Sequence, residues 1–125
     1  MPVVMDHQVI PARDKDESAS FLARVMGLQR EEGGGHFAPV RLDDGSILDF
    51  ETRPDVPRLH FAFRVTEAEF DEILARLQAE SVPHGSLGST YDGQVNTDRP
   101  GRGVYFPDPS GHSLEVITQP YERQR

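Results

Sequence analysis

The 125-residue chain contains no cysteine and no tryptophan, and it has few basic residues. The absence of cysteine excludes disulfides, thiolate metal sites and cysteine nucleophiles. Lysine and arginine total 13 against 21 aspartates and glutamates, which gives a net charge of −8. Because nucleic acids and anionic membranes are bound by basic surfaces, neither is expected as a main partner.

Long apolar runs are also missing. No stretch approaches the roughly 18 residues that a membrane span needs. The first residues, MPVVMDHQVIPARD, lack the basic flank and long apolar core of a secretory signal peptide. We therefore expect a cytoplasmic location. The length is typical of one domain, and the 11 glycines and 10 prolines predict short elements separated by turns.

The first half of the chain predicts a strand, a helix and a pair of strands. Asp14 and Glu17 have the spacing of a capping box, and the apolar positions that follow form one helical face ending at Gly27. Asp43, Asp44 and Gly45 predict the hairpin turn. The strands are expected at residues 3–10, 37–42 and 47–50.

The second half repeats this order. Thr66 and Glu69 form another capping box, followed by apolar residues at helical spacing. Residues 52–58 hold two prolines and predict a linker, so that one module covers about 1–53 and the other about 58–120. The strands of the second half are expected at residues 59–65, 103–106 and 112–118.

The two halves form an internal repeat. His7 and His60, 53 residues apart, each lie in a strand that precedes a capped helix. The segments GSILDFET and GHSLEVIT align at a distance of 66 residues, which matches Asp49 with Glu115. Each half therefore opens with a histidine-bearing strand and closes with a carboxylate-bearing strand.

The repeated residues have the chemistry of metal ligands. Asp49 and Glu115 stand between apolar neighbours, and because strand residues alternate faces, both face either solvent or a concave interior. An interior carboxylate needs a cation or hydrogen bonds. Two histidines and two carboxylates would suit Zn, Ni, Fe or Mn. The alternatives are hydrogen-bonded or surface histidines and solvated carboxylates, but pseudo-symmetric halves would bring all four residues to one axis.

At these residues the chain resembles the vicinal oxygen chelate superfamily, which includes glyoxalase I, extradiol dioxygenases and the fosfomycin and bleomycin resistance proteins. The resemblance covers about 3–120. It rests on His7 and on the segments VMGL (25–28), LHFAFRV (59–65) and DPSGHSLEVI (108–117). It implies an α+β fold in which two βαβββ modules form a curved mixed sheet around a metal, within one domain that works as a homodimer.

The resemblance also implies roles for the repeated residues. His7, His60 and Glu115 match the metal positions of the family, and Asp49 falls where glyoxalase I has a fourth ligand, usually glutamate. The implied activity is that of a metal-dependent enzyme whose divalent ion chelates two adjacent oxygens of a small substrate and stabilises an oxyanion. Asp49 or Glu115 would act as general base.

Three functions stay open. Glyoxalase-like lyase or isomerase chemistry is favoured. A ring-cleaving dioxygenase matches VYFPDPSGHSLE (104–115), but Asn96, Thr97 and Asp98 stand where its signature has an upstream histidine. A non-catalytic protein that sequesters an antibiotic or another small molecule is the third alternative, and the retained triad of candidate ligands argues against it.

Two residues near the candidate ligands have competing interpretations. By strand alternation, Tyr105 points away from its neighbours and could donate a hydrogen bond to a bound oxyanion, or it could be a packed tyrosine with its hydroxyl at the rim. His112 has odd spacing to Glu115, which places it on the opposite face of the strand, and we expect it to be structural.

Overall fold

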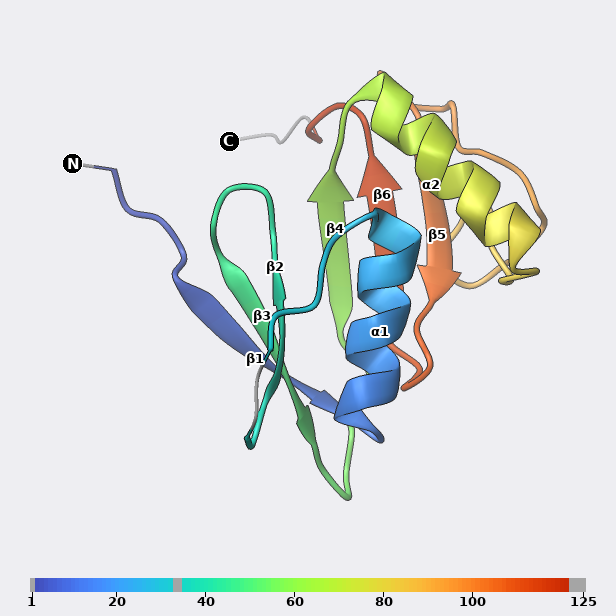
Figure 1. Ribbon diagram of the computed structural model, residues 1–125. Coiled ribbons are helices and arrows are strands. Elements are labelled where there is room, and N and C mark those ends of the chain that lie inside the picture. Colours follow the sequence, from blue (N-terminus) through green and yellow to red (C-terminus); the bar gives the residue numbers. More distant parts are fainter. Residues whose placement is uncertain (1, 33–34, 122–125) are drawn as a thin grey trace. The chain divides into compact units, whose positions relative to one another are not determined.

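The computed structural model describes residues 2–32 and 35–121; residues 1, 33–34 and 122–125, which include both ends of the predicted domain, lie outside the described part. The chain divides into two compact units, Met1–Pro57 and Arg58–Arg125. Each unit contains a helix and a three-stranded mixed sheet (Figure 1), which confirms the predicted α+β class. No helix within the two described ranges has the length and apolar character that crossing a bilayer requires.

The first unit consists of β1 (His7–Ala12), α1 (Lys15–Met26), β2 (Ala38–Arg41) and β3 (Ile47–Thr52). In its sheet, β3 is central, with β1 parallel and β2 antiparallel to it. The Asp14 side chain caps α1 by accepting from the backbone N–H groups of Asp16 and Glu17, and the helix ends at Gly27, which has a φ of 72°. Both predicted ends of this helix are confirmed.

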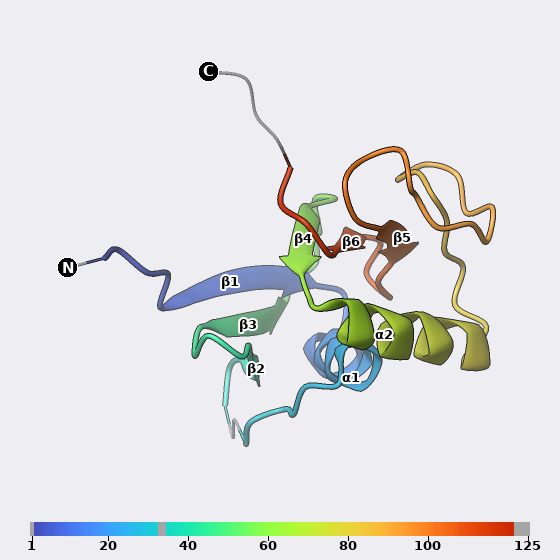
Figure 2. The same ribbon diagram turned by 90° about the horizontal axis from the view of Figure 1, so that it is seen from above.

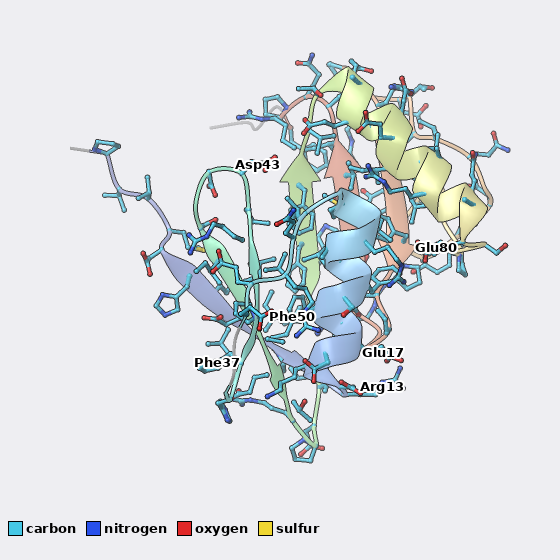
Figure 3. The ribbon with its side chains drawn as sticks, viewed as in Figure 1. Arg13, Glu17, Phe37, Asp43, Phe50 and Glu80 are labelled. Carbon is cyan, nitrogen blue, oxygen red and sulfur yellow. The ribbon has the colours of Figure 1, made fainter. Side chains whose placement is uncertain are left out.

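One face of the first sheet is apolar and contacts α1. Ile10, Val40 and Phe50 come from three adjacent strands and are buried, and α1 contributes Phe21 and Leu22 to the same core. Figure 3 labels Phe50 on β3 and also Asp43, which lies exposed in the predicted hairpin turn. Because strand residues alternate, the residues between the buried ones lie on the other face.

The predicted strand at 3–10 was wrong at both ends. Residues 3–6 are outside β1, and Val3 and Val4 are exposed, whereas the strand continues to Ala12. The register explains the difference: His7 pairs with Ile47, where β3 begins, so the residues before Asp6 have no neighbouring strand to pair with. Valine favours strands, but a strand needs a hydrogen-bonding partner.

The second unit consists of β4 (His60–Arg64), α2 (Glu67–Ala79), β5 (Gly103–Pro107) and β6 (Ser113–Ile117). β6 is central, with β4 parallel and β5 antiparallel to it. Figure 2 shows α2 along one face of this sheet. The buried helix residues Phe70, Ile73 and Leu77 have the spacing predicted for its apolar face.

The two sheets share one register. His7 pairs with Ile47 in the first unit, and His60 pairs with Ser113 in the second. Asp49 is opposite Pro39 on the antiparallel strand, and Glu115 is opposite Tyr105. The two carboxylates, their antiparallel partners and the partners of the two histidines each follow the 66-residue offset of the sequence repeat, whereas the histidines are 53 residues apart, so the repeat extends to strand pairing.

The modules differ from prediction in the number of regular strands. In the described residues, each unit has three strands, and the place of a further strand is taken by an isolated bridge, Arg30↔Val40 in the first unit and Gly85↔Tyr105 in the second. The segments that follow the helices are rich in glycine and proline, which disfavour regular strands. These edges are therefore paired through single bridges, to which Asn96↔Gly103 adds a second along β5.

The capping box of α2 yields a stability prediction. The Thr66 hydroxyl accepts from the Glu69 backbone N–H at 3.1 Å, and Glu69 Oε1 accepts from the Thr66 N–H at 2.9 Å. Replacement Thr66→Ala should lower the free energy of unfolding by about 1 kcal/mol, measured by urea denaturation. Thr66→Ser keeps the hydroxyl and is the control; equal losses in both variants would contradict the capping role.

The same box predicts a pH dependence. Hydrogen bonds from the backbone N–H and then the hydroxyl of Thr66 lower the pKa of Glu69 from its ordinary 4.5. A lowered folded-state pKa stabilises the protein above pH 4.5, and this stabilisation is lost as the pH falls through the folded-state value. Stability of the wild type relative to Glu69→Gln should therefore fall on acidification below that pH. A constant difference between the two proteins across urea melts from neutral to acidic pH would show that the carboxylate is not involved.

Candidate metal centre and adjoining pocket

β4 and β6 place His60 and Glu115 on the same face of the second sheet. His60 pairs with Ser113, and Ala62 pairs with Glu115 on the neighbouring parallel strand. Glu115 is therefore two residues beyond the partner of His60, which places both side chains on the same face. His60 Nε2 lies 3.0 Å from Glu115 Oε1. The carboxylate is 2% exposed, whereas about half of the imidazole is open to solvent. The pair therefore has a buried side and an open side.

The other nitrogen of His60 determines the chemistry of this pair. Its Nδ1 lies 3.1 Å from the backbone carbonyl of Ser113, and because a carbonyl only accepts, Nδ1 carries the hydrogen. In a neutral imidazole, Nε2 then has a lone pair that faces Glu115 Oε1. Two lone pairs at this distance repel each other. The contact is therefore favourable only with a proton or a cation between Nε2 and Oε1.

The second oxygen of Glu115 is bonded to the segment that follows β6. The Tyr121 hydroxyl donates to Glu115 Oε2, and it lies 3.1 Å from the Tyr105 hydroxyl. Burial, followed by the hydrogen bond with Glu115, raises the pKa of Tyr121 well above its ordinary value, so the phenol keeps its proton. The Tyr105 ring stacks beside His60 with the ring centroids 6.1 Å apart. Tyr105 thus contacts both residues that touch Glu115.

A pocket of ≈ 320 Å³ adjoins this cluster within the second unit. It is lined by the loop before β5, by inward-facing residues of β5 and β6, and by the segment after β6. Glu115 and Tyr105 lie in its wall, together with Arg99 and Tyr121. Asn96 also lines it, but its side-chain amide donates to Ser86 O at 3.0 Å and thereby holds the loop together.

In the first unit, His7 and Asp49 occupy the equivalent positions. His7 Nδ1 lies 2.8 Å from Asp6 Oδ2, and this hydrogen bond is the main cause that raises the pKa of His7, with a smaller contribution from the charge of Asp49. Nδ1 therefore carries the hydrogen here too, and Nε2 is the atom left with a lone pair in neutral His7. His7 is exposed and Asp49 is half-buried.

The structure therefore places the four predicted ligands in two pairs, one in each unit. Within the described residues of either unit, no third His, Asp or Glu completes a cluster that could hold a metal ion. The predicted catalytic residue Tyr105 belongs to the second cluster, where its hydroxyl faces Tyr121. His112 is fully buried, and its Nδ1 accepts from the Leu59 backbone N–H at 3.0 Å, which agrees with the expected structural role.

Sequence reasoning missed two residues of this cluster. Tyr121 lies six residues after Glu115, beyond the end of β6, and Arg99 lies in the irregular loop before β5. The Arg99 guanidinium carbon is 3.9 Å from the centroid of the Tyr121 ring. Neither residue is part of a periodic pattern or of the repeat. The only available signal was chemical: an aromatic and a basic residue flanking a strand that carries a buried acid.

A model of the Glyoxalase/Bleomycin resistance protein/Dioxygenase superfamily matches residues 4–116, nearly the whole chain. The chain belongs to this superfamily. Members of the superfamily usually bind a divalent metal, act on small molecules and often form dimers. The comparison supports the resemblance that the sequence motifs indicated and the repeated strand register described above.

Several relatives of known name are similar over most of their length. Two solved structures, the oxidases ChaP-H1 and ChaP-H2, share 39% and 37% identity with the chain, each with a TM-score of 0.89. The alignments cover 98% of this chain and 100% of ChaP-H1, and 97% of both chains for ChaP-H2. Metallothiol transferase FosB of Lysinibacillus sphaericus (strain C3-41) is 27% identical over 121 residues, 91% of this chain and 81% of the relative.

Gly101 in the pocket wall gives a prediction with a matched control. It has a φ of 77°, and a Cβ at this position would overlap Thr118 Oγ1 and Gln119 Cγ. Gly93 has nearly the same φ, 75°, but open space around it. Gly93→Ala should destabilise the protein by about 1 kcal/mol through backbone strain alone, and Gly101→Ala by about 1–2 kcal/mol more. Urea denaturation measures the free energy of unfolding of both variants. Equal decreases would show that Thr118 and Gln119 move aside without cost when a Cβ is added at Gly101.

Proposed function

We propose that this protein is a metal-dependent enzyme acting on a small oxygenated molecule that binds in the pocket beside His60 and Glu115. The observation that carries the proposal is the contact between His60 Nε2 and Glu115 Oε1, made while Nδ1 donates to the Ser113 carbonyl. Metal-binding histidines usually donate their second N–H to a carbonyl or a carboxylate, which fixes the ring and its tautomer. His60 has this arrangement.

The distance between the two donor atoms supports the proposal. In octahedral coordination, neighbouring ligand atoms that bind a divalent ion at about 2.1 Å are at right angles to each other and lie about 3 Å apart. The observed separation is 3.0 Å. Because the Tyr121 hydroxyl occupies Oε2, Glu115 would offer Oε1 alone. The residues present therefore fit an ion held by one imidazole nitrogen and one carboxylate oxygen from the second unit.

Two protein ligands are fewer than the three that catalytic metal sites commonly have. We propose His7 as the third ligand and Asp49 as the fourth, as the sequence repeat predicts. His7 supports this role because Asp6 binds its Nδ1 and leaves Nε2 for the ion. The mixed nitrogen and oxygen donors suit Zn, Ni, Fe or Mn.

A divalent ion at this place would supply Lewis acidity to two adjacent substrate oxygens. The chain's own groups would then divide the remaining tasks. Tyr121 holds Glu115 with one oxygen turned toward His60, and the Tyr105 ring packs beside the imidazole. Asp49, which is less buried than Glu115, is the carboxylate better able to exchange a proton with a substrate.

The comparisons bear on the type of chemistry. The sequence alone favoured a lyase or isomerase of the glyoxalase kind, but the oxidases ChaP-H1 and ChaP-H2 share more than a third of their residues with this chain. We therefore propose an oxygen-using oxidation as the activity. A glyoxalase-like reaction is the second candidate, because the sequence resemblance matches Asp49 with the additional carboxylate ligand of glyoxalase I, and this carboxylate could take a proton.

Metal analysis tests the proposal directly. Untagged wild-type protein should hold about one divalent ion per binding site after reconstitution and dialysis. His60→Ala and Glu115→Gln should each reduce the bound metal by at least about tenfold, because the first removes a nitrogen donor and the second replaces a charged oxygen donor with a neutral amide oxygen. His36→Ala is the control, since His36 is exposed and bonded to Glu51. Unchanged metal content in both test variants would overturn the proposal.

Metal dependence and oxygen uptake separate the candidate activities. Iron-dependent turnover with oxygen consumption would support the oxidation. Activation by nickel, zinc or cobalt without oxygen uptake would replace it with lyase or isomerase chemistry. A metal-free protein that binds a small molecule stoichiometrically without turnover would instead point to sequestration.

A further inference from the structure

The pocket of the second unit has two arginines in its wall, and their environments differ. Arg102 is neutralised: its Nε lies 2.8 Å from Glu67 Oε1, and its Nη2 lies 2.9 Å from Asp71 Oδ1. Its guanidinium also packs over the Phe70 ring at 4.3 Å. Arg102 therefore ties β5 and its preceding loop to α2 and has little capacity left for a ligand.

Arg99 has no such neutralising contact. Among the described residues, no carboxylate lies within ion-pair distance of its guanidinium, which instead lies 3.9 Å above the Tyr121 ring. The hydrogen bond with the Tyr121 hydroxyl raises the pKa of Arg99 above its ordinary value, so the charge persists at all physiological pH values. This is notable in a chain with a net charge of −8. Other arginines of the described residues pair with carboxylates, among them Arg30, Arg41 and Arg53.

The Tyr121 side chain positions Arg99. The guanidinium carbon lies 3.9 Å from the centroid of the Tyr121 ring, and the guanidinium also hydrogen-bonds to the Tyr121 hydroxyl. Because these contacts already restrain the side chain, Arg99 loses less conformational entropy when a ligand binds, and the N–H donors that Tyr121 does not use remain for that ligand. Planar N–H pairs match the two oxygens of a carboxylate, which gives a bidentate, charge-assisted contact. The fixed guanidinium is thus prepared to bind a planar anion in the pocket.

The pocket wall carries opposite charges at different places. Glu115 is buried at one part of the wall, with His60 beside it, and the positive Arg99 stands at another part, held apart from the carboxylate by the Tyr121 side chain. A ligand with an anionic group and a separate reacting oxygen would be oriented by these two groups. The anion would bind Arg99, and the reacting oxygen would face Glu115 and His60.

We propose that Arg99 is the specificity-determining residue of this pocket and that the molecule bound there carries a carboxylate, which the guanidinium binds with two N–H donors. The inference rests on the proposed function in one respect, that this pocket is the substrate pocket. It adds a substrate class, small organic carboxylates, and assigns it to a residue that takes no part in holding the ion.

Benzoate and benzamide test the proposal, since they have the same shape and differ in charge. Each is titrated into 15N-labelled protein kept metal-free with EDTA, and the dissociation constant is read from the backbone amide shifts of Gly101 and Gly103 in the pocket wall. Benzoate should bind wild-type protein at least about tenfold more tightly than benzamide, as expected for a charge-assisted bidentate contact. Absent benzoate binding, or equal affinity for the two probes, would overturn the proposal.

Three variants locate the effect. Arg99→Gln should bring benzoate affinity down to that of benzamide, and Arg99→Lys, which keeps the charge but loses the planar donor pair, should give an intermediate value. Arg76→Gln on α2 is the matched control and should leave both affinities unchanged, because Arg76 pairs with Glu72 and does not line the pocket. Benzoate binding that is the same in Arg99→Gln and wild type would overturn the assignment.

Metal content measured on a separate portion of each protein, reconstituted and dialysed without EDTA, separates this inference from the proposed function. Benzoate preference that depends on Arg99, in a protein that binds no metal on reconstitution, would support the carboxylate subsite and overturn the metal-dependent function. If instead His60→Ala loses the metal while wild-type protein binds benzoate and benzamide equally, the metal-dependent function is supported and the carboxylate subsite is overturned. Circular dichroism confirms that each variant is folded, which is expected because Arg99 is exposed.

Discussion

The burial of the Glu115 carboxylate is the constraint on which the arrangement of the second unit depends. A carboxylate withdrawn from water is stable only if both oxygens receive hydrogen bonds or face positive charge. The Tyr121 hydroxyl satisfies one oxygen, and His60 faces the other. Since the Ser113 carbonyl fixes the hydrogen of His60 on Nδ1, the second oxygen is left to a proton or a cation. The affinity for a positive charge at this place thus follows from the backbone of β6 and the side chain beside it.

The sequence predicted this pair because strand geometry is local. Alternation along β6 places Glu115 opposite in direction to Leu114 and Val116, and the parallel register brings His60 onto the same face. The repeat supports the same prediction, because the 66-residue offset between Asp49 and Glu115 also separates their strand partners, Pro39 and Tyr105. Helix ends were equally predictable, because caps such as Thr66 with Glu69 lie within a few residues of each other.

What the sequence did not predict depends on contacts without a period. Arg99 and Tyr121 meet because an irregular loop and the segment after β6 follow particular paths, and no hydrogen-bond ladder or helical face specifies those paths in advance. The start of β1 was missed for a related reason: Val3 and Val4 have strand propensity, but β3 does not extend far enough to pair with them. The region around the candidate site was therefore predictable where sheet and helix geometry determine it, and not where loops do.

The two halves share a backbone plan but bury their carboxylates to different extents, and loops account for the difference. In the second unit, the connection from α2 to β5 returns to the sheet edge through bridges at Gly85 and Asn96, and the segment after β6 brings Tyr121 onto Glu115. In the first unit, a single described bridge, Arg30↔Val40, accompanies the shorter connection, and Asp49 stays half-buried. A buried, doubly bonded carboxylate is held in one orientation, which suits a ligand, whereas a more exposed one exchanges protons readily. Duplication of one scaffold with unequal loops therefore places the two equivalent acids in different environments.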